Sequence, residues 1–171
     1  FWEDRGEVRM QLKPHAPGIR KFSEQALTAK ARTIIKSMRA SKDSGKAVMF
    51  YSCIIGSIPG QTATAIKVAD TFVRSLRERL DQVFIINPAE YFEPGMDGDD
   101  LMFMWEQVQR SGLINIWRFQ SMEDIEASFG LMGLKVPPVW SGKDATFSTG
   151  CTKEMRIALD MQRSHPELQI V

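Results

Sequence analysis

The sequence predicts an α/β fold, with an open parallel sheet flanked by helices in Rossmann-like or flavodoxin-like layering and a helical extension at the N-terminus. Residues 46–55 and 82–86 are short and nearly all apolar, which is typical of parallel strands covered on both faces. Residues 62–80 lie between them and repeat apolar side chains at helical spacing. This alternation of strands and helices favours a parallel sheet with right-handed connections.

Prolines, glycines and capping residues delimit the elements of the N-terminal half. Pro14, Pro17 and Gly18 indicate an irregular arm, which we expect to contribute little to the core. Ser23 is predicted to cap the first helix. In order, we expect an arm (1–20), a helix (23–39), a strand (46–55), a turn (56–60) and a helix (62–80).

The C-terminal half shows the same alternation. Asp99 or Asp100 is predicted to cap a helix, and Ser121 with Asp124 resembles a capping box. Two consecutive prolines restrict residues 134–140 to a strand end or an edge strand. In order, we expect a strand (82–86), a loop (93–99), a helix to about residue 110, a strand (114–119), a helix (121–129), the strand end (134–140), a helix (152–163) and a strand (168–171).

Length and composition indicate a globular protein. A chain of 171 residues can bury a substantial core, and 43% hydrophobic with 25% charged residues is ordinary for a globular domain. No apolar run approaches the roughly 18 residues of a membrane span. We therefore expect a cytoplasmic protein with a basic arm and helix at residues 1–45 and an α/β domain at residues 46–171. Because the chain begins with Phe1 rather than Met, we also expect a fragment or a processed form.

Charge is distributed unevenly along the chain. Residues 1–80 carry 15 Lys and Arg against 7 Asp and Glu, whereas residues 81–171 carry 7 against 14. The basic region from Arg9 to Lys46 could meet an acidic protein, the acidic half of another copy in a homo-oligomer, or nucleic acid, or it could be a solvated helix face. Its only aromatic residue is Phe22. Because single-strand binders need stacking groups, we favour a protein partner over nucleic acid.

The two cysteines lie far apart in the sequence. Cys53 is in an apolar run and is predicted to be a buried thiol. Neither Cys53 nor Cys151 has the spacing of a metal site or of a disulfide framework. A reducing compartment is the default for such a chain, and we expect neither a metal nor a cofactor.

Two candidate ligand segments follow the first two predicted strands, where open parallel sheets bind ligands. Residues 55–62 could cradle a phosphate or a ribose through backbone amides, or form a tight turn. They are not a Walker loop, because Gln61 stands in the place of the lysine. In residues 87–91, Glu90 could reach a sugar hydroxyl or be a solvent-exposed acid. The candidate ligand-binding residues of the first segment are Gly56, Ser57, Gly60, Gln61 and Thr62.

The third candidate segment is the hydroxyl-rich stretch 140–159, which places Glu154 in the first turn of a predicted helix. Free amides at a helix N-terminus attract anions or polar ligand groups. The alternative is a surface loop in which Thr149 or Thr152 caps the helix and Glu154 favours its dipole. The candidate ligand-binding residues in front of Glu154 are Ser148 and Gly150.

Together these segments resemble the nucleoside 2-deoxyribosyltransferase-like proteins, which include nucleotide N-glycosidases, over residues 47–171. The similar features are a strand with a Gly-rich loop (51–60), an Asn-Pro-Ala-Glu turn (87–90), an Asp-Ile-Glu-Ala segment (124–127), a Pro-Pro-Val-Trp-Ser segment (137–141) and a stretch similar to the family's small-Gly-x-x-x-Glu motif (148–158). The spacing from Gly150 to Glu154 is one residue longer than in the commonest form of that motif. The resemblance implies a nucleoside or nucleotide ligand, with Asp124 among its binding residues.

The resemblance also implies that Glu154 is a nucleophile that attacks the anomeric carbon of the sugar, or a group that stabilises the positive charge developing there. This chemistry suits a carboxylate, because breaking an N-glycosidic bond builds oxocarbenium character. The chain departs from the family in residues 129–135, which supply no second Asp, and in its basic extension. The alternative hypothesis is a non-catalytic component of a larger assembly that binds a partner through its basic N-terminal region.

Overall fold

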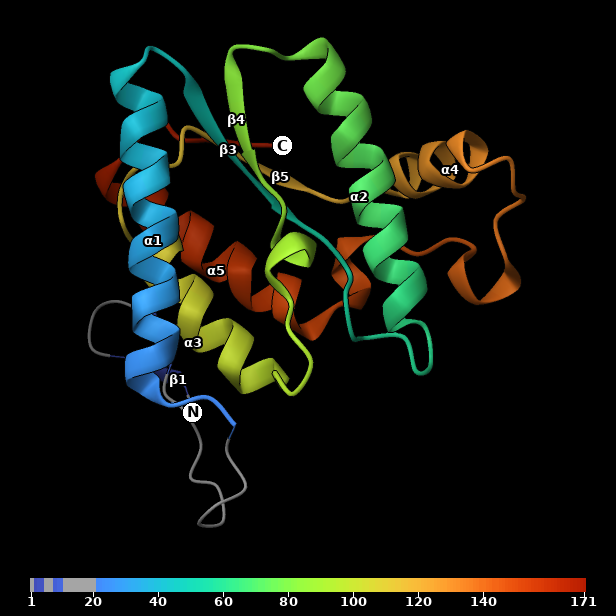
Figure 1. The fold of residues 1–171 in the computed structure, drawn as a ribbon, viewed down its shortest axis with the longest axis horizontal. Coiled ribbons are helices and arrows are strands. Elements are labelled where there is room, and N and C mark those ends of the chain that lie inside the picture. Colours follow the sequence, from blue (N-terminus) through green and yellow to red (C-terminus); the bar gives the residue numbers. More distant parts are fainter. Residues whose placement is uncertain (1, 5–7, 11–20) are drawn as a thin grey trace.

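The computed structural model, which describes residues 2–4, 8–10 and 21–171, has the α/β fold that the sequence predicts. Within these residues the main sheet has four parallel strands in the order β4-β3-β5-β6 (Figure 1). The strands are β3 (Ala47–Ser52), β4 (Val83–Ile86), β5 (Ile116–Phe119) and β6 (Gln169–Ile170). Strand β3 is central, and its Phe50 pairs with Ile86 on one side and with Trp117 on the other.

Helices cover both faces of the sheet. They are α1 (Glu24–Asp43), α2 (Thr62–Arg79), α3 (Gly98–Gln109), α4 (Met122–Leu131) and α5 (Thr149–Ser164). Helices α1, α3 and α5 pack on one face and α2 and α4 on the other, so that the chain forms three layers (Figure 1). Short 3-10 helices lie in the connections: η1 (Pro88–Tyr91), η2 (Pro138–Trp140) and η3 (Ala145–Phe147).

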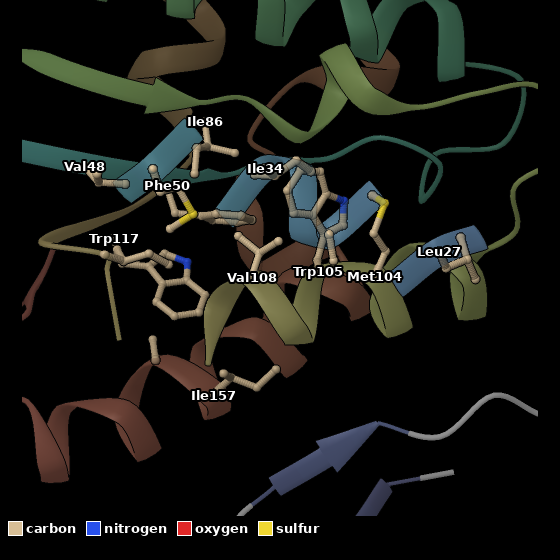
Figure 2. Packing of buried hydrophobic residues seen from close by; sticks show 14 of the residues in the cluster. Leu27, Ile34, Val48, Phe50, Ile86, Met104, Trp105, Val108, Trp117 and Ile157 are labelled. Carbon is tan, nitrogen blue, oxygen red and sulfur yellow. The ribbon is translucent and has the colours of Figure 1, made fainter. Parts of the chain in front are cut away.

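Successive side chains of β3 enter opposite cores, because side chains alternate along a strand. Phe50 points toward α1, α3 and α5, and its ring centroid lies 5.4 Å from those of Trp105 and Trp117 (Figure 2). Its neighbour Tyr51 enters the opposite layer and stacks on Phe72 of α2 at 5.6 Å. Burial on both faces explains why this segment is continuously apolar in the sequence.

Helix α1 is an integral layer of the fold. Ser23 caps it as predicted, and Leu27 and Ile34 are buried with residues of β3 and α3 (Figure 2). Helix α1 therefore shares one hydrophobic core with β3, α3 and α5. The helix ends at Asp43, beyond the predicted end near residue 39, and the chain then turns at Gly45, whose φ of +89° suits glycine.

Two helix caps differ from those predicted. Helix α3 is capped by Asp97, whose carboxylate accepts a hydrogen bond from the Asp100 N–H at 2.8 Å, while the Asp100 carboxylate accepts one from the Asp97 N–H at 3.1 Å. Helix α5 is capped by Ser148, whose hydroxyl accepts a hydrogen bond from the Cys151 N–H at 3.2 Å. In both cases the cap is the last residue with an extended backbone, which directs its side chain at the free amides of the first turn.

The predicted strand end at residues 134–140 is wrong. This segment is a loop that leads into η2, where Trp140 turns inward and its ring lies 5.9 Å from that of Phe129. Proline has no N–H to donate to a sheet ladder, whereas Pro138 is well placed as the first residue of a helix.

The predicted irregular arm is also wrong in part. Trp2–Asp4 (β1) and Val8–Met10 (β2) pair as a short antiparallel hairpin. The other residues of the predicted arm, including its prolines, lie outside the described residues. Across the described ranges, no helix combines the length and the apolar character that a membrane crossing requires.

Candidate active site

A pocket of about 440 Å³ lies at the carboxyl ends of β3 and β4. The loop after β3, the start of η1 and the N-terminal ends of α3 and α5 enclose it. Its volume falls within the range of small-molecule sites, and its position is the one at which open parallel sheets bind ligands. The fold therefore offers a ligand site where the sequence predicts one.

The lining of the pocket is apolar and polar by segment. The end of η1, the loop after it and α3 supply the apolar residues Phe92, Met96, Leu101, Met102 and Trp105. The loop after β3 and the starts of α2 and α5 supply Gly56, Ser57, Thr62, Thr149, Gly150 and Lys153. Asp97 and Asp99 line the pocket at the start of α3. A ligand with one apolar and one polar part would match this lining.

Glu154 lies on the wall of this pocket although only 7% of its surface is exposed. Gln109 of α3 donates a side-chain N–H to the carboxylate. The Ser52 hydroxyl and the Cys151 thiol lie beside the carboxylate and lower its pKa as hydrogen-bond donors. Within the described part of the chain, no ion pair involves Glu154. Burial raises its pKa to about 7, because desolvation outweighs the three hydrogen bonds that lower it.

The groups that contact Glu154 come from three elements. Ser52 is the last residue of β3, Gln109 is the last residue of α3, and Cys151 lies in the first turn of α5. Ser52 is fully buried, and its hydroxyl oxygen accepts a hydrogen bond from the Trp117 indole N–H at 2.8 Å. The carboxyl group is therefore held where the central strand meets the two helices.

Both cysteines also line the pocket, and both thiols are free. The prediction that Cys53 is buried is confirmed, and Cys151 is buried as well. Burial raises the pKa of both thiols, and the neighbouring Glu154 raises it further. Because the thiolate is the reactive form, burial disfavours both cysteines as nucleophiles.

The structure brings six of the predicted site residues to this pocket. They are Gly56, Ser57, Thr62, Ser148, Gly150 and Glu154. Local space does not require the two glycines: a Cβ at Gly56 would meet nothing within 4 Å, and one at Gly150 would make ordinary contacts at 3.6 and 3.7 Å. Their contribution is the exposed backbone that they leave along the polar segments.

Two predicted residues of the same segment do not line the pocket. Gly60 forms the tight turn before α2, with a φ of +72°. Gln61 faces away, and its side-chain oxygen accepts a hydrogen bond from the Trp140 indole N–H at 3.0 Å. The alternative prediction for residues 55–62, a tight turn, therefore fits Gly60 and Gln61, whereas Gly56, Ser57 and Thr62 line the pocket.

The two remaining predicted acids also lie outside the pocket. Glu90 pairs with Arg77 of α2 at 2.7 Å. Asp124 is buried and pairs with Arg118 at 2.8 Å, while closing the predicted capping box of α4 with Ser121. Each carboxylate already has a cationic partner, so we assign both a structural role.

Sequence reasoning missed Ser52, Trp105 and Gln109. A signal existed for two of them, because Ser52 interrupts an apolar strand and Gln109 occupies a buried helix position. A polar residue at a core position needs a partner, so each such position indicates a buried interaction. Nothing in the sequence connects these residues with Glu154, since the contacts depend on how the strand and the two helices pack.

The described residues contain no cluster of three or more His, Cys, Asp or Glu side chains that could hold a metal ion. Comparisons with protein-family models, with curated proteins and with solved structures give no match.

Proposed function

We propose that this chain binds a nucleoside or a nucleotide in the pocket and cleaves or transfers its N-glycosidic bond, with Glu154 as the nucleophile. One observation carries the proposal: a buried carboxyl group with no ion-pair partner in the described residues faces a ligand-sized pocket. Such a group costs folding free energy, which a structural role does not explain. The resemblance to deoxyribosyltransferase-like proteins supports the choice of bond.

The two kinds of lining segment support a ligand of this class. The apolar segments, with Phe92 and Trp105, suit a planar base. The polar segments suit a sugar, and Lys153 beside the start of α5 suits a phosphate if the ligand carries one. Asp97 and Asp99 oppose a phosphate at the start of α3, which favours an orientation with the phosphate toward α5.

The reaction follows from the position of Glu154. Its ionised carboxylate attacks the anomeric carbon while the carbon–nitrogen bond breaks, and the electron pair of that bond leaves with the base. Water then opens the glycosyl ester in hydrolysis, or a second base opens it in transfer. Because only the carboxylate form attacks and burial raises its pKa to about 7, kcat/KM should fall about tenfold per pH unit below that value.

The test is to incubate the chain with a panel of deoxynucleosides and nucleotides and to measure released base by chromatography. Glu154→Gln keeps the size of the side chain and should lower turnover by roughly 10³-fold or more. Glu90→Gln is the matched control, since Glu90 pairs with Arg77 outside the pocket and should leave turnover unchanged. Undiminished release by Glu154→Gln would exclude the nucleophile, and no release by the native chain from any substrate would exclude the reaction.

A further inference from the structure

The hydrogen bonds around Glu154 carry an inference that rests on, and deepens, the proposed function. We propose that Ser52, oriented by Trp117, and Gln109 are positioning residues that fix the Glu154 carboxylate in the orientation for attack. Neither residue belongs to the predicted site, and both are almost completely buried, at 0% and 1% exposure. Their role follows from the donors and acceptors that meet at the carboxylate.

The Trp117 indole determines the direction of the Ser52 hydroxyl. An indole N–H can only donate, so at 2.8 Å it occupies a lone pair of the Ser52 oxygen. The hydroxyl has a single proton, which is then free for the carboxylate of Glu154, the acceptor with which Ser52 also bonds. Trp117 is itself fully buried between the sheet and α5 (Figure 2). Packing therefore fixes the indole that orients the Ser52 hydroxyl.

Gln109 contacts the Glu154 carboxylate from α3, which packs beside α5. Its amide nitrogen donates to Glu154, whereas its amide oxygen is buried and accepts no hydrogen bond from the residues that the structure describes. A glutamine retained for structure alone would pair both ends, because an unpaired buried acceptor is destabilising. The unpaired oxygen also lets the amide turn over and accept a hydrogen bond from the O–H of Glu154 when the carboxyl group is neutral.

Both residues stabilise the ionised form of Glu154, because each donates a hydrogen bond to it. Removing either donor should therefore raise the pH at which Glu154 ionises. Other titratable or charged groups on the same pocket are Cys53, Cys151, Lys153, Asp97 and Asp99. All of these stay unchanged in the variants below, so a shift can be assigned to the lost donor.

The experiment compares Ser52→Ala and Gln109→Met with two matched controls. Ser128→Ala removes an equally buried hydroxyl that donates to the Val68 carbonyl oxygen, and Gln107→Met removes an amide of the same helix that donates to Thr28. Glu154 is followed by NMR of ¹³C-labelled glutamate across pH, with its signal assigned by Glu154→Gln. Base release is measured in parallel.

We expect the ionisation midpoint of Glu154 to rise by about one pH unit in Ser52→Ala and in Gln109→Met and to stay unchanged in both controls. In the same two variants kcat should fall about tenfold with little change in KM, since ligand contacts remain. An unchanged midpoint in both variants would overturn the inference. A shifted midpoint in a chain that releases no base from any substrate supports the positioning and refutes the proposed reaction instead.

Discussion

Two buried carboxylates of this chain have opposite surroundings. Asp124 is 3% exposed, pairs with Arg118 at 2.8 Å and accepts a further hydrogen bond from the Tyr51 hydroxyl at 3.2 Å. Glu154 is 7% exposed and is contacted by neutral donors, among them the Gln109 amide. Asp124 lies beneath the start of α4, away from the pocket, whereas Glu154 lies on the pocket wall.

The difference separates an acid that an ion pair holds in place from the acid that we propose to be reactive. A buried charge is tolerated when a cation and hydrogen bonds replace its water, as at Asp124. At Glu154 the donors that replace water among the described residues are neutral, and desolvation still raises its pKa. The buried carboxylate destabilises the folded chain, but its pKa of about 7 lets the group change its protonation state near neutral pH. Burial alone therefore does not identify a reactive acid, and our proposal for Glu154 rests on burial beside a cavity without an ion-pair partner in the described residues.

The largest effect on stability should come from breaking the Asp124 pair. Asp124→Asn keeps the shape of the side chain but leaves Arg118 without its counter-charge, so the free energy of unfolding should fall by about 2–4 kcal/mol. Urea denaturation at pH 7 measures this change. The control is Glu123→Gln, an exposed acid on the same helix, which should change little. If Asp124→Asn is as stable as this control, the pair does not compensate the buried charge and the comparison fails.

A change of opposite sign is expected at Glu154. Its folded-state pKa of about 7 lies above its ordinary value of 4.5, so the folded chain binds the extra proton and loses stability as pH rises through that interval. Glu154→Gln should remove this loss and increase the free energy of unfolding by about 1–3 kcal/mol at pH 8, with no gain at pH 4. Urea denaturation of both chains across this pH range measures the difference. A constant difference between pH 4 and pH 8 would show that burial does not destabilise the Glu154 carboxylate.

Much of the fold could be predicted because local signals and tertiary packing agree. The helix that begins at Thr62 and the capping box of Ser121 with Asp124 occur where sequence patterns place them. The prediction of a strand end at residues 134–140 was wrong because an apolar run was interpreted as a strand. The buried Trp140 belongs to the 3-10 helix η2 instead. The predicted cap of α5 was wrong because three residues with hydroxyl groups lie close together in the sequence. The extended backbone of Ser148 makes it the cap.

The candidate site was predictable in part. Glu154, Ser148 and the loop after β3 follow from the rule that ligands bind beyond the carboxyl ends of parallel strands. That rule equally favoured Glu90, which the structure pairs with Arg77 instead. Whether an acid meets an arginine or a pocket depends on side chains from distant elements, so it cannot be inferred from the acid's own segment.

The smallest effect on stability is expected for exposed charges, which water solvates, in contrast to the two buried carboxylates. Within the basic region from Arg9 to Lys46, Lys30 of α1 contacts Glu93, whereas Lys36 and Arg39 are exposed. Water solvates exposed charges of this kind, so Lys36→Glu with Arg39→Glu should leave Tm within a few degrees, measured by thermal denaturation. If this face binds an acidic protein, as we proposed from the charge asymmetry, the same variant should abolish a salt-sensitive pull-down that the native chain gives. A large fall in Tm would show that these charges stabilise the fold, and salt-sensitive binding to DNA or RNA instead would overturn the preference for a protein partner.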